Sequence, residues 1–179
     1  LSVEGVSPYL SVSIVSNNST FSEYDYNIEN EAEHYAKGDK VTVYVNNETL
    51  ESAEEEYGYK FKTNSKDFTL DNVPEYVSSL SQLSDDDNKK LQNQAKDVVE
   101  AYLAQEDEYF EASDLKYVGS YLLYSKEIGN DSYYGDSNDY YCVFSAKVTN
   151  NKHSKTVYFP VLFKDINKCG EDEVIYEEY

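Results

Sequence analysis

The sequence contains neither methionine nor tryptophan, and it has only two histidines, two cysteines and three prolines among its 179 residues. Because no methionine opens the chain, we expect a mature fragment, with any signal peptide, lipid anchor or membrane helix lying upstream. No segment approaches the roughly 20 consecutive apolar residues that span a bilayer. Two cysteines cannot form a zinc site without histidine partners, and both histidines, His34 and His153, lie in polar segments.

Motifs of the common enzyme classes are also absent. The chain has no phosphate-binding loop, no dinucleotide-binding glycine pattern and no zinc-protease helix motif. A serine or cysteine nucleophile would need His34 or His153 as its base, and neither lies near a nucleophile elbow. We therefore predict no catalytic residue and no cofactor. Carboxylate pairs are numerous among 35 acidic residues, so an acid/base hydrolase stays open as an alternative.

The charge and the aromatic content are both unusual. Acidic residues number 35 and basic residues 15, which gives a net charge of −20. A surface of this charge repels phosphate backbones and excludes nucleic acid as a partner. The chain also has 20 tyrosines and seven phenylalanines. Tyrosine suits half-buried strands, because its ring packs while its hydroxyl stays hydrated.

One segment, residues 84–103, has a clear helical period. Ser84 is the predicted N-cap, and Asp87 completes a capping box. The apolar residues that fall on one face of this helix are Leu91, Ala95, Val98, Val99 and Tyr102. We expect this face to pack against the strands that follow residue 115. Val98→Asp should then destabilise the protein severely, because it would bury an unpartnered carboxylate.

Short alternating segments precede the helix. We predict strands at residues 9–16, 21–31, 41–45, 57–63 and 68–70. Gly38 supplies a turn before the third of them, and the acidic run 51–56 is predicted to be a solvated loop or a short helical turn. Short strands at roughly ten-residue spacing are typical of an immunoglobulin-like β-sandwich. We assign this domain to residues 1–82.

More strands follow the helix, at residues 115–125, 139–149, 156–164 and 174–176. Residues 106–113 are expected to extend the helix. Pro160 lacks a backbone N–H, so its strand should lie at an edge or carry a bulge. Residues 83–179 are therefore predicted to form one helix on a four-stranded antiparallel sheet, as in cystatin-like or NTF2-like folds, within a chain that is α+β overall.

The polar loop at residues 131–139 carries two candidate sites. Hard oxygen ligands at this density could bind calcium, and the ligands would be Asp131, Asp136, Asn138 and Asp139. A polar hairpin loop would have the same composition. Exposed tyrosines favour binding surfaces, and four flank this loop: Tyr133, Tyr134, Tyr140 and Tyr141. The alternative is that these are ordinary strand residues.

The two cysteines are separated by a predicted hairpin. If the strands at 139–149 and 156–164 pair, the chain beyond residue 164 returns toward the start of the first strand. Cys169 then comes within possible reach of Cys142. A disulfide between them and two unpaired thiols both remain open.

Four segments resemble the extracytoplasmic region of Gram-positive membrane proteins or lipoproteins of unknown function that carry a zinc ribbon. They are KGDKVTVYV at 37–45, FTLDNVPEYV at 68–77, YVGSYLL at 117–123 and PVLF at 160–163. The ribbon cysteines and the membrane helix of those proteins are not part of this chain. The resemblance implies a place outside the cytoplasm, at the cell surface or anchored to the membrane, and it implies no catalytic residue.

Two functions follow as expectations. The first is a non-enzymatic extracytoplasmic module of a cell-envelope protein, which binds a protein or a cell-wall ligand or acts as a spacer. The second is an acid/base hydrolase that cleaves cell-wall glycan through a carboxylate pair. A cleft with two carboxyl groups, one with its pKa raised by burial, would favour the hydrolase.

Overall fold

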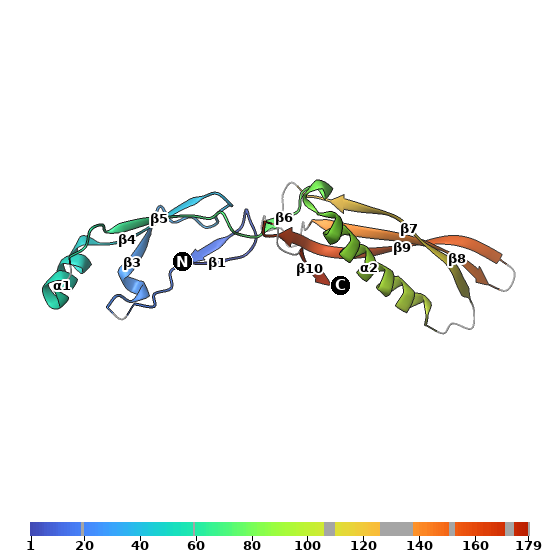
Figure 1. Ribbon diagram of the computed structural model, residues 1–179, viewed down its shortest axis with the longest axis horizontal. Coiled ribbons are helices and arrows are strands. Elements are labelled where there is room, and N and C mark those ends of the chain that lie inside the picture. Colours follow the sequence, from blue (N-terminus) through green and yellow to red (C-terminus); the bar gives the residue numbers. More distant parts are fainter. Residues whose placement is uncertain are drawn as a thin grey trace. The chain divides into compact units, whose positions relative to one another are not determined.

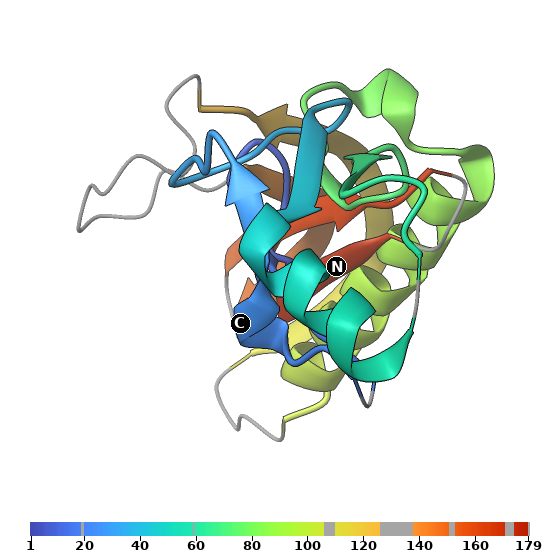
Figure 2. The same cartoon turned by 90° about the vertical axis from the view of Figure 1, so that its left-hand side faces the viewer.

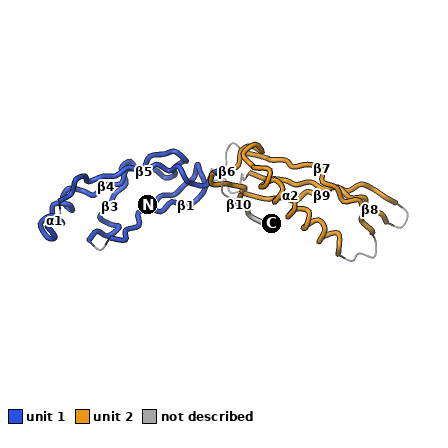
Figure 3. The backbone as a smooth tube through the Cα atoms, in the orientation of Figure 1, with its two compact units in different colours: residues 1–75 blue, residues 76–179 orange. Residues whose placement is uncertain are grey.

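The structure is a computed structural model that describes residues 1–18, 20–58, 60–105, 110–125, 138–150, 153–170 and 174–178. The chain forms two compact units, residues 1–75 and 76–179 (Figure 3). Helices and mostly antiparallel strands occur in the chain, which confirms the mixed class that the sequence predicts. The boundary lies at residue 75 rather than 82, because Val77 and Leu83 pack into the core of unit 2.

Unit 1 contains two small antiparallel sheets. One pairs β1 (Ser2–Glu4) with β2 (Ser11–Ser13), and the other has the order β3 (Tyr26–Glu29), β4 (Lys40–Val45) and β5 (Ser65–Thr69). A short 3-10 turn, η1 (Glu23–Asp25), precedes β3, so the strand predicted from residue 21 begins later. Gly38 has the positive φ of 88° that was expected for the turn before β4.

Unit 1 also contains a helix that the sequence analysis assigned differently. Helix α1 (Asn47–Tyr57), teal in Figure 2, occupies the acidic run and the start of the strand predicted at 57–63. The Asn46 side chain accepts a hydrogen bond from the Thr49 backbone N–H at 2.8 Å, and Gly58 ends the helix with φ 69°. Asn46 as an N-cap and Gly58 as a C-terminal stop are sequence signals for a helix between them. The sequence analysis instead gave more weight to the alternation of aromatic residues from Tyr57, and the strand predicted there was wrong.

Unit 2 is an antiparallel sheet with one face covered by a helix (Figure 1). The strands have the order β10-β9-β8-β7, and β6 also pairs with β9. The elements are β6 (Glu75–Tyr76), η2 (Leu80–Gln82), α2 (Asp85–Leu103), β7 (Glu111–Leu123), β8 (Asp139–Asn150), β9 (His153–Lys168) and β10 (Ile175–Glu178). The prediction that residues 106–113 extend the helix is wrong for residues 111–113, which pair with β8 instead, and residues 106–109 lie outside the described residues.

Helix α2 begins at its predicted cap. The Ser84 hydroxyl accepts a hydrogen bond from the Asp87 N–H at 3.1 Å, and the Asp87 carboxylate accepts one from the Ser84 N–H at 2.9 Å. Asp87 also accepts a hydrogen bond from Lys168 Nζ at 2.5 Å. The two side chains of this ion pair are only 9% and 13% exposed. The pair therefore links the first turn of α2 to the end of β9.

The face of α2 that contacts the sheet differs from the predicted one. Leu91, Ala95 and Val99 are buried, whereas Val98 and Tyr102 are each 55% exposed. The buried residues follow an i, i+4 row, which drifts around the helix by about 40° per step. The line of helix residues that contact the sheet therefore winds slowly around α2 as the helix crosses the strands. The prediction that Val98 and Tyr102 are buried is therefore wrong, and with it falls the reason to expect that Val98→Asp destabilises the protein severely.

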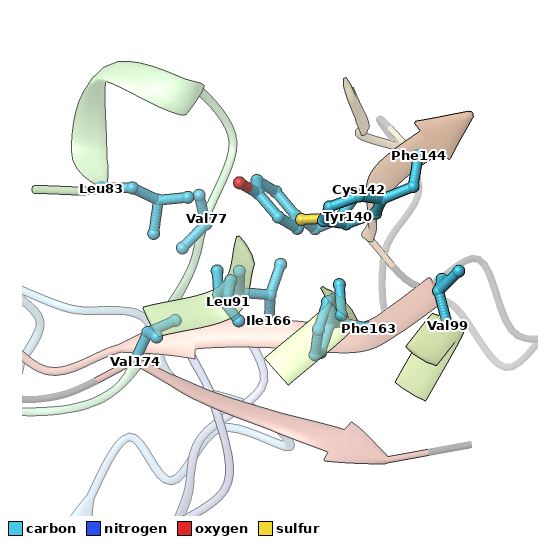
Figure 4. Packing of buried hydrophobic residues seen from close by; sticks show 11 residues of the cluster. Val77, Leu83, Leu91, Val99, Tyr140, Cys142, Phe144, Phe163, Ile166 and Val174 are labelled. Atoms are coloured by element: carbon cyan, nitrogen blue, oxygen red, sulfur yellow. The ribbon is translucent and has the colours of Figure 1, made fainter. Parts of the chain in front are cut away.

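The core of unit 2 lies between α2 and the sheet (Figure 4). Its members come from the helix, from alternate positions of β8, from two positions of β9, and from the segments before α2 and β10. The buried residues are Val77, Leu83, Leu91, Ala95, Val99, Tyr140, Cys142, Phe144, Phe163, Ile166 and Val174. The linker at 73–83, predicted to pack at a junction, thus contributes two side chains to this core.

Edges and bulges shape the long strands of the sheet. β10 pairs with β9 from Phe163 onward, so among the described strands Pro160 has a neighbour only in β8, opposite Val143. This confirms the predicted edge position. In β7 the register shifts between Ser113 and Lys116 and again between Tyr117 and Gly119. Asp114, within the first irregularity, has a positive φ of 55°.

Candidate functional site

The sheet of unit 2 has a second face, opposite α2, that is rich in aromatic and apolar side chains. Successive residues of a strand point to opposite faces, so the core positions Tyr140 and Cys142 place Tyr141 and Val143 on the other side. With their partners in β7 and β9 they form a surface that we name the outer sheet face. Its residues are Tyr121, Tyr141, Val143, Tyr158, Pro160 and Leu162.

The strand register arranges these residues in rows. Tyr121, Tyr141 and Leu162 lie side by side in one row, and Gly119, Val143 and Pro160 lie side by side in the next. A Cβ atom at Gly119 would lie 3.7 Å from the Tyr121 hydroxyl, so the tyrosine ring leans over the glycine. The side chains of Tyr121 and Tyr158 are 55% and 62% exposed. The outer sheet face thus has exposed aromatic rings on either side of a row with small side chains, which includes Gly119.

The four predicted binding tyrosines do not form one surface. Tyr133 and Tyr134 lie outside the described residues. Tyr141 belongs to the outer sheet face, and its hydroxyl donates a hydrogen bond to Asp139 Oδ2 at 3.2 Å. Tyr140 points the opposite way and is fully buried. Two consecutive strand residues cannot share a face, so grouping Tyr140 with Tyr141 was wrong.

Tyr140 belongs to a partly buried polar cluster around Ser120. The Tyr140 hydroxyl lies 2.8 Å from Ser120 Oγ and 3.1 Å from Asn88 Oδ1. Tyr117 Oη and Cys142 Sγ lie 2.6 and 3.5 Å from the same serine oxygen. Burial raises the pKa of both Tyr140 and Cys142 above their ordinary values. Neither group is thereby activated as a nucleophile or a base, and the cluster satisfies polar groups inside the core.

The predicted calcium ligands have two separate outcomes. Asp131 and Asp136 lie outside the described residues. Asn138 is fully buried, and its Nδ2 donates hydrogen bonds of 2.6 Å to the carbonyls of Val77 and Ile166. This role, which ties the start of unit 2 to β9, differs from the predicted one. Within the described ranges, no three His, Cys, Asp or Glu side chains gather as a metal site would.

The two cysteines are thiols in the structure. The predicted hairpin of β8 and β9 is present and pairs Cys142 with Val161. However, β9 continues past an irregularity at Asp165 to Lys168, so Cys169 follows Val161 by eight residues. At about 3.3 Å per residue this is far beyond the roughly 7 Å between Cα atoms that a disulfide can bridge. Of the two alternatives left open by the sequence, the structure therefore has the two unpaired thiols and not the disulfide.

Thiol titration tests this arrangement. In denaturant without a reducing agent, we expect two titratable thiols per chain. In the native protein Cys142 should react far more slowly than Cys169, because Cys142 is fully buried and its pKa is raised. Cys142→Ser serves as the control, since it should remove only the slow phase. Fewer than two thiols in the denatured chain would contradict the expectation.

The carboxyl groups that the structure describes give no support to an acid/base pair. The hydrolase would require a carboxyl whose pKa is raised. Among the described carboxyl groups, clear shifts occur at Asp67 and Asp87, and both pKa values are lowered. Hydrogen bonds from Lys40 and Thr42 lower that of Asp67. At Asp87 burial raises the pKa, but hydrogen bonds from Lys168 and Ser84 outweigh it.

Unit 1 holds a second candidate site, which the sequence analysis missed. A depression of about 320 Å³ lies on one side of the β3–β4–β5 sheet. We name it the aromatic groove, and its main lining residues are Phe21, Tyr26, Val43, Phe61, Lys66 and Phe68. A neighbouring depression of about 230 Å³ shares Tyr26, Val43 and Phe68 with it. The lining comes from distant segments, so no local sequence pattern reveals it.

Comparisons of the chain with models of protein families, with curated protein sequences and with solved structures found no match. In the part of the chain that the structure describes, neither helix has the length and apolarity needed to cross a membrane.

Proposed function

We propose that the chain is a non-enzymatic binding module of an extracytoplasmic cell-envelope protein, and that the outer sheet face of unit 2 binds cell-wall glycan. The observation that carries the proposal is the exposure of Tyr121 and Tyr158, at 55% and 62%, on one face of an antiparallel sheet. Large exposed aromatic residues on a rigid scaffold are typical of binding surfaces. The resemblance to extracytoplasmic regions and the net charge of −20 agree with this place in the cell.

Glycan suits this face better than a charged polymer does. The sugar rings of a glycan have apolar faces that can stack on the flat tyrosine rings. Their hydroxyl groups can form hydrogen bonds with the phenol hydroxyls. The Tyr141 hydroxyl is held by Asp139, and burial together with this carboxylate raises the pKa of Tyr141. The phenol therefore stays protonated. A strongly acidic polymer would be repelled by a chain with a net charge of −20.

The finer fold assignment forms part of the same proposal. Unit 2, with one helix across an antiparallel sheet, is proposed to be cystatin-like or NTF2-like. Unit 1, with its two small antiparallel sheets, is proposed to be a variant of the immunoglobulin-like sandwich in which α1 is an addition. In this arrangement unit 1 can serve as the spacer.

Sedimentation with insoluble cell-wall material tests the proposal. We expect the parent protein to co-sediment, and Tyr121→Ala and Tyr158→Ala each to lower the affinity at least about tenfold, as removal of an aromatic anchor does. Tyr24→Ala is the matched control, because Tyr24 is 88% exposed and lies in unit 1. All three variants should keep the melting temperature of the parent, since exposed positions contribute little to stability.

Release of reducing sugar, measured in the same samples, separates binding from hydrolysis. We expect none during prolonged incubation. Release that persists in the tyrosine variants would favour the hydrolase, and equal sedimentation of all four proteins would reject the outer sheet face as the binding surface.

A further inference from the structure

The aromatic groove exists because the inner face of the β3–β4–β5 sheet packs into two separate clusters. Val41 lies in one cluster with Leu10 and Leu70, and Val45 lies in the other with Phe21 and Ala53. Val43, between them, is only partly buried. Edge-to-face ring contacts fix one wall of the groove, since the centroids of Phe21 and Phe61 are 5.6 Å apart. The groove is therefore a feature of a packed scaffold.

The groove has one cationic side chain. Lys66 pairs with Val43 in the strand register, which places both side chains on the groove side of the sheet. Lys66 Nζ lies 4.8 Å from the centroid of the Phe68 ring. It makes no ion pair with any residue that the structure describes. By contrast, Lys40 at the same sheet pairs with Asp67 at 2.5 Å.

Two polar groups at the rim already make hydrogen bonds within the protein. Asn18 Oδ1 accepts a hydrogen bond from the Thr20 N–H at 2.7 Å, and Thr63 Oγ1 donates one to the Ser65 carbonyl at 3.0 Å. Among the residues that line the groove, Lys66 is the one with a positive charge. A ligand of this groove would place its apolar part on the aromatic side chains and a negative group at Lys66. An anion is otherwise disfavoured by a chain of net charge −20, so Lys66 determines where it binds.

We propose that the aromatic groove binds a free acyl carboxylate, with its carboxylate on Lys66 Nζ and its chain along Phe68, Val43 and Tyr26. The main depression, at about 320 Å³, reaches the size of small-molecule sites. The neighbouring depression extends it past the shared residues Tyr26 and Val43, which suits a linear chain. This site lies in unit 1, and it does not depend on the proposed glycan surface of unit 2.

A fluorescent fatty acid, cis-parinaric acid, and its uncharged methyl ester test the proposal. We expect the parent protein to bind the acid about tenfold more tightly than the ester, as a charge-assisted hydrogen bond predicts. Lys66→Met should remove this preference by weakening the acid alone. Lys62→Met is the matched control, because Lys62 is an exposed lysine nearby that does not line the groove. Val43→Phe, which fills the groove, should weaken both probes at least about tenfold.

Each other result overturns the proposal. It fails if the parent binds neither probe, if Lys66→Met keeps the preference for the acid, or if Lys66→Met and Lys62→Met behave alike. It also fails if the protein binds phosphatidylglycerol vesicles but not the free acid, which would indicate a membrane surface instead. Lys66 is exposed, so its variant should fold even if the filled groove of Val43→Phe does not.

Discussion

Replacing Ala95 with aspartate should unfold unit 2 or cost it at least about 3 kcal/mol of stability, because the new carboxylate has no partner in the core. Ala95 is fully buried between α2 and the sheet, in a cluster with Leu91 and Val99. A charged group there must either lose its hydration or force α2 away from the strands. Urea unfolding at neutral pH, followed by far-ultraviolet circular dichroism, measures the loss.

Val98→Asp is the matched control for this variant. It places the same side chain three residues further along the same helix, at a position that is 55% exposed. Valine and aspartate have similar helix propensities, so we expect a change within about 0.5 kcal/mol. If both variants lost equal stability, the contact face of α2 described above would be wrong.

Lys168→Met should destabilise unit 2 by about 2–3 kcal/mol at neutral pH, because it leaves the Asp87 carboxylate buried without its cation. This is somewhat below the cost for a fully buried pair, since the two side chains keep 9% and 13% of their exposure. The loss would fall on the first turn of α2, which Asp87 also caps. Urea unfolding of the variant and the parent provides the comparison.

The pH dependence of this effect has a definite sign. The pKa of Asp87 is lowered in the folded protein from its ordinary value of 3.8. The stability that the ion pair contributes is thus fully present above about pH 3.8, and it is lost as the pH falls through the lowered value. The difference between parent and Lys168→Met should shrink over that window.

Lys96→Met provides the control for charge removal on its own. Lys96 pairs with Glu100 on the exposed side of α2, with both side chains about half exposed. Such a pair contributes about 0.5 kcal/mol or less, and its removal should show no comparable pH dependence. An equal loss in both lysine variants would show that the Asp87–Lys168 pair has no special role.

Local signals predicted the parts of the fold that depend on neighbouring residues. The Ser84 capping box, the turn at Gly38 and the edge position of Pro160 all follow from the chemistry of one residue and its neighbours. The side of α2 that is buried did not follow from such local chemistry, because it depends on how the helix crosses a twisted sheet. Val98 is on the apolar side of the helix by sequence, yet it lies beside the contact stripe rather than in it.

The candidate sites were predictable to a smaller extent. Tyr141 was identified, and the alternation along TVYFPVLFK contained Tyr158, Pro160 and Leu162 on one side. However, which of the two faces of this strand packs against α2 depends on its pairing with β8. The aromatic groove brings Phe21, Phe61 and Phe68 together through the packing of α1 and the β3–β4–β5 sheet. No single segment carries that information.

The irregularities of β7 have a consequence for how copies of the chain meet. β7 is 13 residues long and, among the described strands, it pairs only with β8. A straight edge of this length would offer a row of N–H and carbonyl groups on which a second chain could add a strand and begin a fibre. The two register shifts, together with the positive φ of Asp114, break that row into short pieces. The outer sheet face can thus remain exposed while the edge strand β7 resists polymerisation.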